Sequence, residues 1–533
     1  MRRRNLLLNS NNIESGAIDQ ESTMQTDKNL WFEKISLAAG LWIVAFAIAT
    51  GSAVAQPIIT QQPTNFFVSI GASATFSVDV DPSSLPATYQ WQKAGTSLAG
   101  ATARLLAFTN IQTANAGTYT VVVRNGGGSV MSDPATLSVD PSFTKITAGP
   151  VVAEGGISAG CAWGDFNNDG WIDLFVVRGS VLQSSQNHLF RNNGDGIFSK
   201  VTTGTIATST NNSLAATWAD FDNDGNLDLF VSRALNQTNA LYRNLGDGTF
   251  AEVLNTPFTA RGGKTQSGTW GDMDGDGNLD LFLTARDSSL NSLYQNLGNG
   301  RFVKITRGIL TTIPSGNFRP GVWADYDNDG DPDLFLNYFL STQNLFFQNE
   351  GDGAFSQILE PNVIRGDAGN RGAAWGDFDN DGNLDLFVGN ALARGNQLFR
   401  NNGNGTFRRM PPDLLEGSAA NSAYPAWGDY DNDGFLDLFV PNGEQTGENN
   451  ALYHNSGNGN FERVQTGSLA NDGGHSVSCG WADFNNDGFL DLFVGNLQGE
   501  RNFLYRNNGN TNHWLKFKLA GTASNRAAIG AKV

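Results

Sequence analysis

Short runs of alternating apolar and polar residues, separated by turn-forming residues, follow one another along most of the chain. In the first part of the chain they occupy residues 73–80, 87–93, 104–111, 117–123 and 135–139. Strands at this spacing predict a β-sandwich. We therefore expect residues 56–141 to form a first, all-β domain.

From residue 142 to residue 511 one pattern recurs seven times: a tryptophan, an acidic loop and an apolar DLF run. The tryptophans are Trp163, Trp218, Trp270, Trp323, Trp375, Trp427 and Trp481. Their spacings are 55, 52, 53, 52, 52 and 54 residues. A nearly constant period of this size indicates a repeated unit of a few packed elements.

Each period contains four candidate strands. The first leads into the tryptophan, the second is the DLF run, and the fourth begins at a phenylalanine after a glycine-rich turn. The third is bounded by asparagines and covers residues 187–192, 239–244, 291–296, 344–349, 396–401, 450–455 and 502–507. Four strands in each of seven units predict a seven-bladed β-propeller.

The two ends of the array predict that the ring closes. The phenylalanine strand first occurs at Phe143, before the first tryptophan, and the last repeat, which ends near Asn510, has none of its own. We expect the Phe143 strand to complete the seventh blade, because this pairing covers the open sheet edges.

The first domain resembles an immunoglobulin-like domain. Its motifs YQWQK and NAGTYTVVV place Trp91 as the buried tryptophan of such a domain and Tyr119 as its tyrosine corner. The bridging cysteines are absent: Val121 stands in the place of the second, and Phe76 or Val78 in the place of the first. Packing must then replace the disulfide. Such a module serves in adhesion or as a spacer, and the fold alone does not decide between these roles.

The acidic loops carry the candidate chemistry. Each reads D-x-[DN]-x-D-G-x-x-D, so the side chains at positions 1, 3 and 5 of a tight loop point to one centre. The glycine at position 6 permits the sharp turn, and the position-7 carbonyl and position-9 aspartate add oxygens. Six or more hard oxygen ligands suit Ca²⁺, whereas Mg²⁺ keeps its waters. A set of Asx-turn hairpins without metal is the alternative.

The predicted ligands are the side chains at positions 1, 3, 5 and 9 of the seven loops. They are Asp165, Asn167, Asp169 and Asp173; Asp220, Asp222, Asp224 and Asp228; Asp272, Asp274, Asp276 and Asp280; Asp325, Asp327, Asp329 and Asp333; Asp377, Asp379, Asp381 and Asp385; Asp429, Asp431, Asp433 and Asp437; and Asp483, Asn485, Asp487 and Asp491. The loops are not EF-hands, because the flanking segments have strand patterns and the twelfth-position glutamate is missing.

The acidic charge of the chain is concentrated in the predicted metal sites. The chain of 533 residues has 52 acidic and 34 basic side chains and a net charge of −18. The predicted ligands include 26 aspartates, half of all acidic residues, so seven Ca²⁺ ions (+14) would bring −18 to −4. Cation binding and blade stability should then be coupled. The acidic surplus argues against nucleic acid or anionic lipid as the main partner.

The sequence argues against a metal site built from histidines and against a scaffold held by many disulfides. The four histidines (His188, His454, His475 and His513) are scattered, and two cysteines cannot build a disulfide-dense scaffold. Cys161 and Cys479 each precede a tryptophan by two residues, where the other repeats have alanine, glycine or proline. A disulfide between adjoining blades and a small-residue packing site both remain open. The seven tryptophans are expected to pack between blades.

The N-terminal segment has the pattern of an export signal. The only long apolar run, residues 35–54, ends in a small-x-small cleavage site at residues 53–55. We expect residues 1–55 to be a signal peptide, with Met24 as a possible true start, and the protein to be secreted or at the cell surface. An uncleaved membrane anchor is the alternative, because the run approaches the length of a membrane span.

The repeats resemble the FG-GAP/VCBS family, the calcium-loop propeller repeat of integrin α-chains and of many secreted bacterial proteins. The resemblance covers about 370 residues, from 142 to 511. Residues 512–533 resemble the truncated start of an ASPIC/UnbV domain, which follows such repeats in the cartilage acidic protein family. The resemblance implies an all-β fold with a seven-bladed β-propeller, extracellular calcium binding and interaction roles, and it brings no catalytic residues.

Two classes of function follow. The first is a secreted, calcium-binding propeller that serves as a binding or adhesion scaffold for protein or glycan partners, and we expect it not to be an enzyme. The alternative is a calcium-dependent polysaccharide lyase or hydrolase, which would need a non-repeated cluster of acid, base or nucleophile. The sequence offers no such cluster and no serine nucleophile motif.

Residues at the end of each DLF strand are expected on the face opposite the acidic loops, where propeller loops can take ligands. They include Arg178, Arg233, Tyr338, Asn390, Asn442 and Asn496.

Overall fold

The computed structural model describes residues 54–514, apart from short internal segments (residues 71–72, 110, 261–262, 287–289, 315, 340, 360–362, 364, 366–368, 393, 416–419, 445–446, 458 and 466). The expected signal peptide (1–55) and the expected ASPIC/UnbV start (512–533) lie almost entirely outside the described residues. In the described part of the chain, no helix is long and apolar enough to cross a membrane. The helical segments there are single turns: α1 (Pro150–Ala153), α2 (Thr205–Thr208), α4 (Gly467–Asn471), η1 (Pro82–Ser84), η2 (Thr113–Asn115), η3 (Ile309–Thr311) and η4 (Pro412–Leu415).

The first domain is a β-sandwich of short strands. They are β1 (Ile59–Gln61), β2 (Phe66–Ile70), β3 (Ala74–Ser77), β4 (Asp79–Val80), β5 (Thr88–Lys93), β6 (Thr96–Ser97), β7 (Leu105–Phe108), β8 (Gly117–Asn125), β9 (Gly128–Met131) and β10 (Ala135–Lys145). Strands β2, β10, β8, β5 and β6 pair in that order in one sheet, and β9 pairs with β8. Separate pairs form between β3 and β7 and between β1 and β4.

Packing replaces the missing disulfide in this sandwich, as the sequence predicts. Phe76, Trp91 and Val121 are fully buried. The ring of Phe76 lies 5.9 Å from that of Trp91 and 5.1 Å from that of Tyr119. The Tyr119 hydroxyl donates to the backbone oxygen of Asn115 at 2.6 Å. This bond, from a buried tyrosine to backbone a few residues upstream, is the tyrosine corner of immunoglobulin-like domains.

Seven four-stranded antiparallel sheets follow. The strands of the first three are β11 (Ser158–Gly164), β12 (Asp173–Arg178), β14 (His188–Asn192) and β15 (Phe198–Val201); β17 (Ser213–Ala219), β18 (Asp228–Arg233), β19 (Ala240–Asn244) and β20 (Phe250–Glu252); and β21 (Thr265–Gly271), β22 (Asp280–Ala285), β23 (Ser292–Asn296) and β24 (Phe302–Lys304). A small extra pair joins β13 (Ser185–Gln186) to β16 (Thr210–Asn211).

The fourth to seventh sheets repeat this order. Their strands are β25 (Phe318–Ala324), β26 (Asp333–Tyr338), β27 (Leu345–Asn349) and β28 (Phe355–Ile358); β29 (Asn370–Gly376), β30 (Asp385–Asn390), β31 (Gln397–Asn401) and β32 (Phe407–Arg409); β33 (Ala426–Gly428), β34 (Asp437–Val440), β35 (Ala451–Asn455) and β36 (Phe461–Arg463); and β37 (Ser476–Ala482), β38 (Asp491–Asn496) and β39 (Phe503–Asn507).

The seventh sheet takes its fourth strand from the start of the array. Residues Phe143, Thr144 and Lys145 of β10 pair antiparallel with Asn507, Arg506 and Tyr505 of β39. The first half of β10 pairs with β8 and β2 of the sandwich, so one strand serves both domains. The prediction that the Phe143 strand completes the seventh blade is therefore confirmed.

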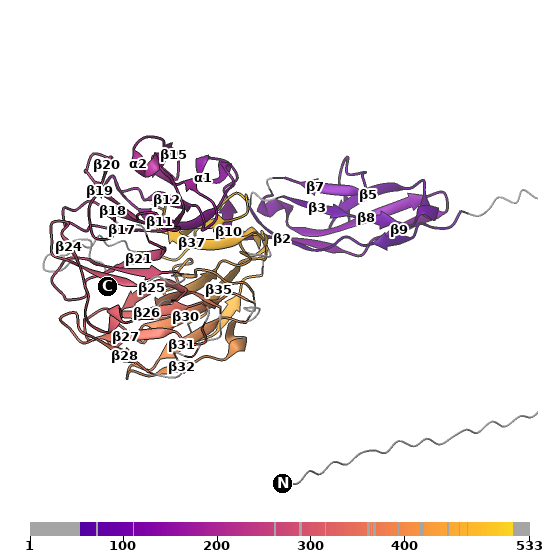
Figure 1. Cartoon of the computed structure of the whole chain (residues 1–533). Helices are drawn as coiled ribbons and strands as arrows, with labels where there is room; N and C mark the ends of the chain where they lie inside the picture. Colours follow the sequence, from indigo (N-terminus) through magenta and orange to yellow (C-terminus); the bar gives the residue numbers. More distant parts are fainter. Residues whose placement is uncertain are drawn as a thin grey trace, which may run out of the picture. The chain divides into compact units, whose positions relative to one another are not determined.

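The seven sheets form a closed ring. The first strand of each sheet contacts the first strand of the next, and β37 of the last sheet contacts β11 of the first. Figure 1 shows β37 beside β11, with the sheets fanning around one centre. The Trp163 indole nitrogen donates to Gly480 O at 3.0 Å, which joins the first sheet to the seventh. The fold is thus an all-β, seven-bladed β-propeller preceded by an immunoglobulin-like sandwich.

The tryptophans of the repeat pack between neighbouring blades. Trp218 donates its indole N–H to Ala162 O at 3.2 Å, and Trp427 and Trp481 make the same bond to Ala374 O and Ala426 O. Trp163 and Trp218 also stack on Phe484 and Phe166, which belong to the acidic loops of the preceding blades. Trp270, Trp323 and Trp375 lack this hydrogen bond but pack edge-on against a phenylalanine of the preceding blade.

Candidate metal centres

Every acidic loop joins the first strand of a sheet to the second. The position-9 aspartate is the first residue of the second strand, as Asp173 is in β12 and Asp385 in β30. All seven loops therefore lie at the same end of the inner strands. The ring thus presents seven equivalent loops on one face.

Hydrogen bonds to backbone N–H groups hold each loop in shape. In the fifth loop the Asp377 carboxylate accepts from Asp381 N at 3.0 Å and Gly382 N at 2.8 Å. The Asp385 carboxylate accepts from Phe378 N at 3.1 Å and from the third-strand residue Asn401 N at 2.7 Å. An Asx turn adds to these bonds, because Asp381 Oδ1 accepts from Asn383 N at 2.9 Å. Hydrogen bonding alone therefore accounts for this part of the loop.

The loops bring the predicted ligands together. Groups of three side chains, each with a ligand atom within 4.8 Å of the others, are Asp220, Asp222 and Asp228; Asp272, Asp274 and Asp276; Asp325, Asp327 and Asp333; Asp377, Asp379 and Asp385; and Asp431, Asp437 and His454. In the first loop the charges of Asp165 and Asp169 raise the pKa of Asp173, and in the seventh loop those of Asp487 and Asp483 raise the pKa of Asp491, so these carboxylates also act on one another.

The position-3 carboxylates show that turn chemistry is incomplete. In five loops the Oδ1 atom of this residue is buried and has no hydrogen-bond partner: Asp222, Asp274, Asp327, Asp379 and Asp431. A buried carboxylate oxygen without a partner costs more than about 1–3 kcal/mol. An Asx turn has no use for this oxygen, whereas a hard cation at the centre of the loop would bind it. The residues therefore fit a calcium ion.

Third-strand side chains hold the outer oxygen of the position-3 carboxylate. Gln295 Nε2 donates to Asp274 Oδ2 at 2.6 Å, and Gln348 Nε2 donates to Asp327 Oδ2 at 2.7 Å. Arg243 and Arg400 pair with the carboxylates at positions 3 and 5 of their loops. These residues orient the carboxylate so that its other oxygen faces the loop centre.

His454 occupies the corresponding place in the sixth loop. Its Nδ1 lies 3.5 Å from Asp431 Oδ2 and 3.2 Å from Asp437 Oδ1. The sequence placed this histidine in a third strand but gave no sign of contact with the acidic loop. Since Ca²⁺ prefers oxygen, we assign His454 the orienting role of Arg243 and Gln295 rather than that of a ligand.

Burial sets the charge state of the position-9 aspartates. It raises the pKa of Asp173 and Asp385 to about 7, and that of Asp228, Asp280, Asp333, Asp437 and Asp491 to about 8. Backbone hydrogen bonds lower these pKa values and neighbouring aspartates raise them further, but burial is the largest cause. A divalent cation at the centre would favour the ionised forms, so metal binding should release protons at neutral pH.

The position-4 asparagines link neighbouring loops. Asn223 Nδ2 donates to Gly277 O of the next loop at 3.1 Å, and Asn486 Nδ2 donates to Gly170 O of the first loop at 3.0 Å. Asn168, Asn328, Asn380 and Asn432 make the same contact to the position-6 oxygen of the following loop. The third loop has Gly275 at this position. This role was not predicted from the sequence, although the recurring Asn-Asp-Gly signals it.

The asparagine that ends each third strand connects blades in a second way. Asn401 Nδ2 donates to Tyr326 O of the preceding loop at 2.7 Å and to Leu384 O of its own loop at 3.1 Å. Asn192 makes the first of these bonds to Phe484 O, from the first blade to the seventh. From the sequence these asparagines were predicted only to bound the third strand.

Two loops have asparagine at position 3. Asn167 Oδ1 accepts from Asp169 N at 3.0 Å, and its Nδ2 is buried without a partner. Asn485 Nδ2 donates to Asp487 Oδ2 at 2.8 Å. These two loops have one carboxylate fewer than the other five, so we expect them to bind a cation more weakly.

The other residues singled out in the sequence lie away from these centres. Cys161 and Cys479 are free thiols, and Cys479 Sγ donates to Tyr424 O, which fits small-residue packing and not a disulfide. Of the residues at the ends of the DLF strands, Arg233, Asn390, Asn442 and Asn496 are buried, and Arg178 and Tyr338 are partly buried. They lie at the strand ends opposite the acidic loops, as predicted, and their part in binding a ligand stays a prediction. Asn442 and Asn496, for example, use their amides to satisfy nearby loop carbonyls.

Comparison with known proteins supports this description. The model of the FG-GAP-like repeat matches residues 165–231, 231–283, 272–336, 337–388, 384–440 and 443–494, and the model of the immunoglobulin domain matches residues 56–125. Cartilage acidic protein 1 of Mus musculus is 29% identical over 175 residues, 31% of this chain and 27% of that protein. The Homo sapiens protein is 28% identical over 197 residues, 35% of this chain and 29% of its own.

The chain therefore spans less than a third of the length of the curated relatives it matches. Among solved structures, rhamnogalacturonan lyase YesW is matched over 84% of this chain and 76% of its own, with 14% identity and a TM-score of 0.26. The repeat matches together cover residues 165–440 and 443–494, more than half of the chain. The chain belongs to the FG-GAP-like repeat family.

Proposed function

We propose that this protein is a secreted β-propeller that binds Ca²⁺ in its acidic loops, up to seven ions, and serves as an extracellular binding or adhesion scaffold. The observation that carries the calcium part is the set of buried position-3 oxygens that lack a partner in five loops. The scaffold part is supported by membership of a repeat family and by relatives whose name places them in cartilage.

The ligand chemistry favours calcium over other cations. The donors at the loop centre are carboxylate and amide oxygens, without a thiolate, and hard oxygen donors suit Ca²⁺ or Mg²⁺. Four side chains from one nine-residue loop form an all-protein site, which Ca²⁺ accepts and Mg²⁺ resists because it keeps its waters. Aspartates buried as deeply as Asp228 and Asp280 also need a positive partner to stay ionised at neutral pH.

Calcium would stiffen the whole ring. Each loop is tied to the next blade by an asparagine, as Asn380 is to Gly434 O at 2.8 Å, so an ion that fixes one loop also fixes the junction with its neighbour. A rigid ring leaves its opposite face as a platform whose loops can vary without disturbing the repeat. We propose protein or glycan partners for that platform.

Calorimetric titration of the metal-free full chain with Ca²⁺ tests the first part. We expect about five strong sites and two weaker ones, with proton release at pH 7, and weak binding of Mg²⁺. A total below two ions would contradict the proposal. A glycan array together with polysaccharide turnover assays tests the scaffold role. Binding without turnover is expected, and turnover abolished by one non-repeated substitution would instead favour the lyase or hydrolase alternative.

A further inference from the structure

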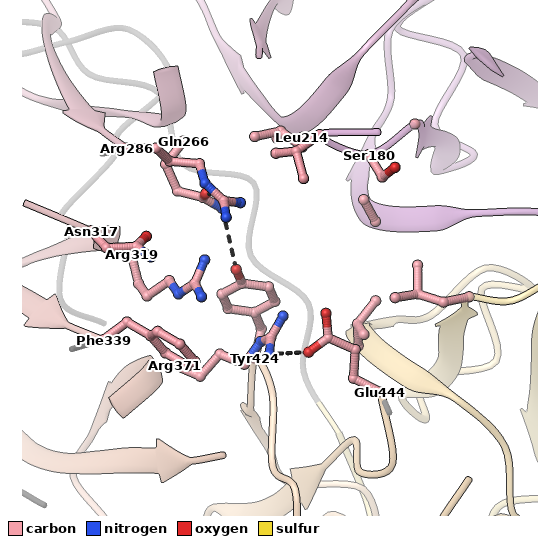
Figure 2. Close-up of a pocket in the computed structure, with 15 residues that line it drawn as sticks. Ser180, Leu214, Gln266, Arg286, Asn317, Arg319, Phe339, Arg371, Tyr424 and Glu444 are labelled. Atoms are coloured by element: carbon pink, nitrogen blue, oxygen red, sulfur yellow. Dashed lines mark hydrogen bonds and ion pairs between the residues drawn. The ribbon is translucent and has the colours of Figure 1, made fainter. Parts of the chain in front are cut away.

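The ring has a central pocket at the end of the inner strands opposite the acidic loops. Its volume is about 320 Å³, and its lining includes Arg286, Arg319, Arg371, Tyr424 and Glu444. Figure 2 shows the side chains of these residues converging from separate strands and loops. Arg319 lies near the start of β25, and Asp325, the first aspartate of the acidic loop, follows directly after this strand. Six residues of extended chain place the pocket roughly 20 Å from the metal centres.

The pocket is built from one repeated position. The residue four before the repeat tryptophan lines it in six of the seven blades: Ala159, Leu214, Gln266, Arg319, Arg371 and Val477. The tryptophan and the aspartates hardly vary between blades, whereas the side chain at this position ranges from small or apolar to polar or positively charged. Structural needs would give similar residues at equivalent positions. The variation therefore points to a role beyond holding the ring together. The positively charged residues at this position, Arg319 and Arg371, belong to the fourth and fifth blades.

Arg319 is a buried charge without an ion pair of its own among the described residues. The residue is only 4% exposed, and its Nε atom has no hydrogen-bond partner. Glu444 is the carboxylate whose charge acts on it, but Glu444 is paired with Arg371. Its guanidinium lies 4.2 Å from the centre of the Phe339 ring, which compensates only part of the cost of burial. A buried arginine without an ion pair lowers the stability of the fold, so an anion that enters the cavity would recover part of the free energy lost by burying the charge.

The charges around Arg319 give the pocket a net positive charge and favour a carboxylate as its ligand. Arg371 pairs with Glu444, and Arg286 donates to Gln266 Oε1 at 3.1 Å. Three arginines and one glutamate give a local charge of 3 − 1 = +2 in a chain of net charge −18. The Arg371 pair shows that a carboxylate fits among these guanidinium groups. A second carboxylate is what Arg319 and Arg286 lack.

The polar groups in the rest of the lining suit a ligand that carries hydroxyl groups in addition to a carboxylate. The Asn317 Oδ1 atom is a buried acceptor without a partner, so the pocket needs a hydrogen-bond donor as well as an anion. Ser180 and the Tyr424 hydroxyl add further polar groups, and the Tyr424 ring offers a flat apolar surface. The volume is at the low end for ligand pockets, which suits one small unit rather than a polymer segment.

We propose that this pocket binds a sugar acid, a hydroxylated ring with one carboxylate, through Arg319 assisted by Arg286 and Arg371. The inference rests on the proposed scaffold function and names the ligand class of its platform. The same chemistry occurs in a free uronic acid and in a uronate unit at the end of a polysaccharide, and the test includes both.

Calorimetry on the calcium-loaded full chain tests the proposal at low ionic strength. The probes are D-glucuronate, D-galacturonate and a short oligogalacturonide, with D-glucose and D-galactose as neutral controls and a calcium-only blank. We expect a uronate to bind at least tenfold more tightly than its neutral sugar, because charge-assisted bonds to a guanidinium are lost in the latter. Binding of the oligogalacturonide but not of the free acids would assign the pocket to a chain end.

Variants separate a binding role from a structural one. Arg319→Gln should weaken uronate binding at least tenfold while leaving the melting temperature unchanged or higher, because an uncompensated buried charge is removed. Glu444→Gln should strengthen binding by freeing Arg371. The matched control is Arg408→Gln, an exposed arginine of β32 in the fifth blade, which should leave binding unchanged.

Three results would overturn the proposal. They are equal binding of uronates and neutral sugars, full binding by Arg319→Gln, and tighter binding of an acidic peptide such as triglutamate than of any uronate. Calcium titration of the same samples separates failure of the sugar-acid inference from failure of the proposed function. Normal calcium binding without uronate binding contradicts the sugar-acid inference alone.

Discussion

The asparagine at the end of each third strand should be a main source of blade cohesion, and Asn401 allows this to be tested. Its side chain makes three hydrogen bonds: to Tyr326 O at 2.7 Å, to Leu384 O at 3.1 Å and from Gly403 N at 3.0 Å. The residue is only 1% exposed and its bond to Tyr326 O is buried, so water cannot replace that bond.

Truncation to alanine leaves two carbonyls and one N–H without a partner. A buried group left in this state costs about 1–3 kcal/mol, and the Leu384 and Gly403 contacts, which are only partly buried, belong at the low end of that range. We therefore expect Asn401→Ala to lower the free energy of unfolding by roughly 3–5 kcal/mol. Asn401→Asp should be worse, because a carboxylate would face two carbonyl oxygens.

Equilibrium urea unfolding of the full chain at saturating Ca²⁺, followed by tryptophan fluorescence, measures this effect. Asn402→Ala is the matched control, since Asn402 is exposed and its side chain bonds only to Thr406 Oγ1 at 2.9 Å. The control should change the free energy of unfolding by less than about 0.5 kcal/mol. If Asn401→Ala proved as mild as its control, the idea that this asparagine ties neighbouring blades together would fail.

Three further predictions concern other parts of the molecule. Asp379→Ala removes the position-3 carboxylate of the fifth loop, so calorimetry should find one strong calcium site fewer than in the unchanged protein; an unaltered stoichiometry would count against that ligand. Burial, and then the charge of Arg178, lower the pKa of His188 from 6.5 to about 4, so its contribution is present above pH 6.5 and is lost as the pH falls towards 4. His188→Gln should therefore flatten the acid side of the stability profile by about 3 kcal/mol, and a profile of unchanged slope would refute this. Tyr119→Phe loses the hydroxyl bond to Asn115 O at 2.6 Å and should lower the stability of the sandwich by about 1–2 kcal/mol in urea unfolding, whereas no loss would deny the tyrosine corner its role.

Periodicity made the fold predictable. The seven tryptophans fix the number of blades, and the displaced Phe143 strand reveals which ends must join, because a missing strand in the last repeat has only one candidate replacement. The acidic loops were predictable for the same reason: their ligands come from nine consecutive residues. Local motifs need no knowledge of tertiary contacts.

Contacts between blades could not be predicted in this way. Asn401 and its partner Tyr326 are 75 residues apart, and nothing in a single repeat says that a strand end of one blade reaches the loop of the blade before it. The residues that line the central pocket could not be predicted either. Asn390 and Asn442, expected on the face opposite the acidic loops, are buried. The pocket is lined by residues such as Arg319, whose position relative to the ring axis depends on the twist of the sheet.

The melting temperature with and without calcium tests the central claim most directly. Ions that bind the folded ring and not the unfolded chain stabilise it in proportion to their number and affinity. Differential scanning calorimetry of the full chain in 1 mM Ca²⁺ and in excess chelator should show a fall of several degrees or more on chelation, reversed by added Ca²⁺ but not by the same concentration of Mg²⁺. An identical melting temperature in both solutions would contradict the claim that these loops hold calcium to keep the ring rigid.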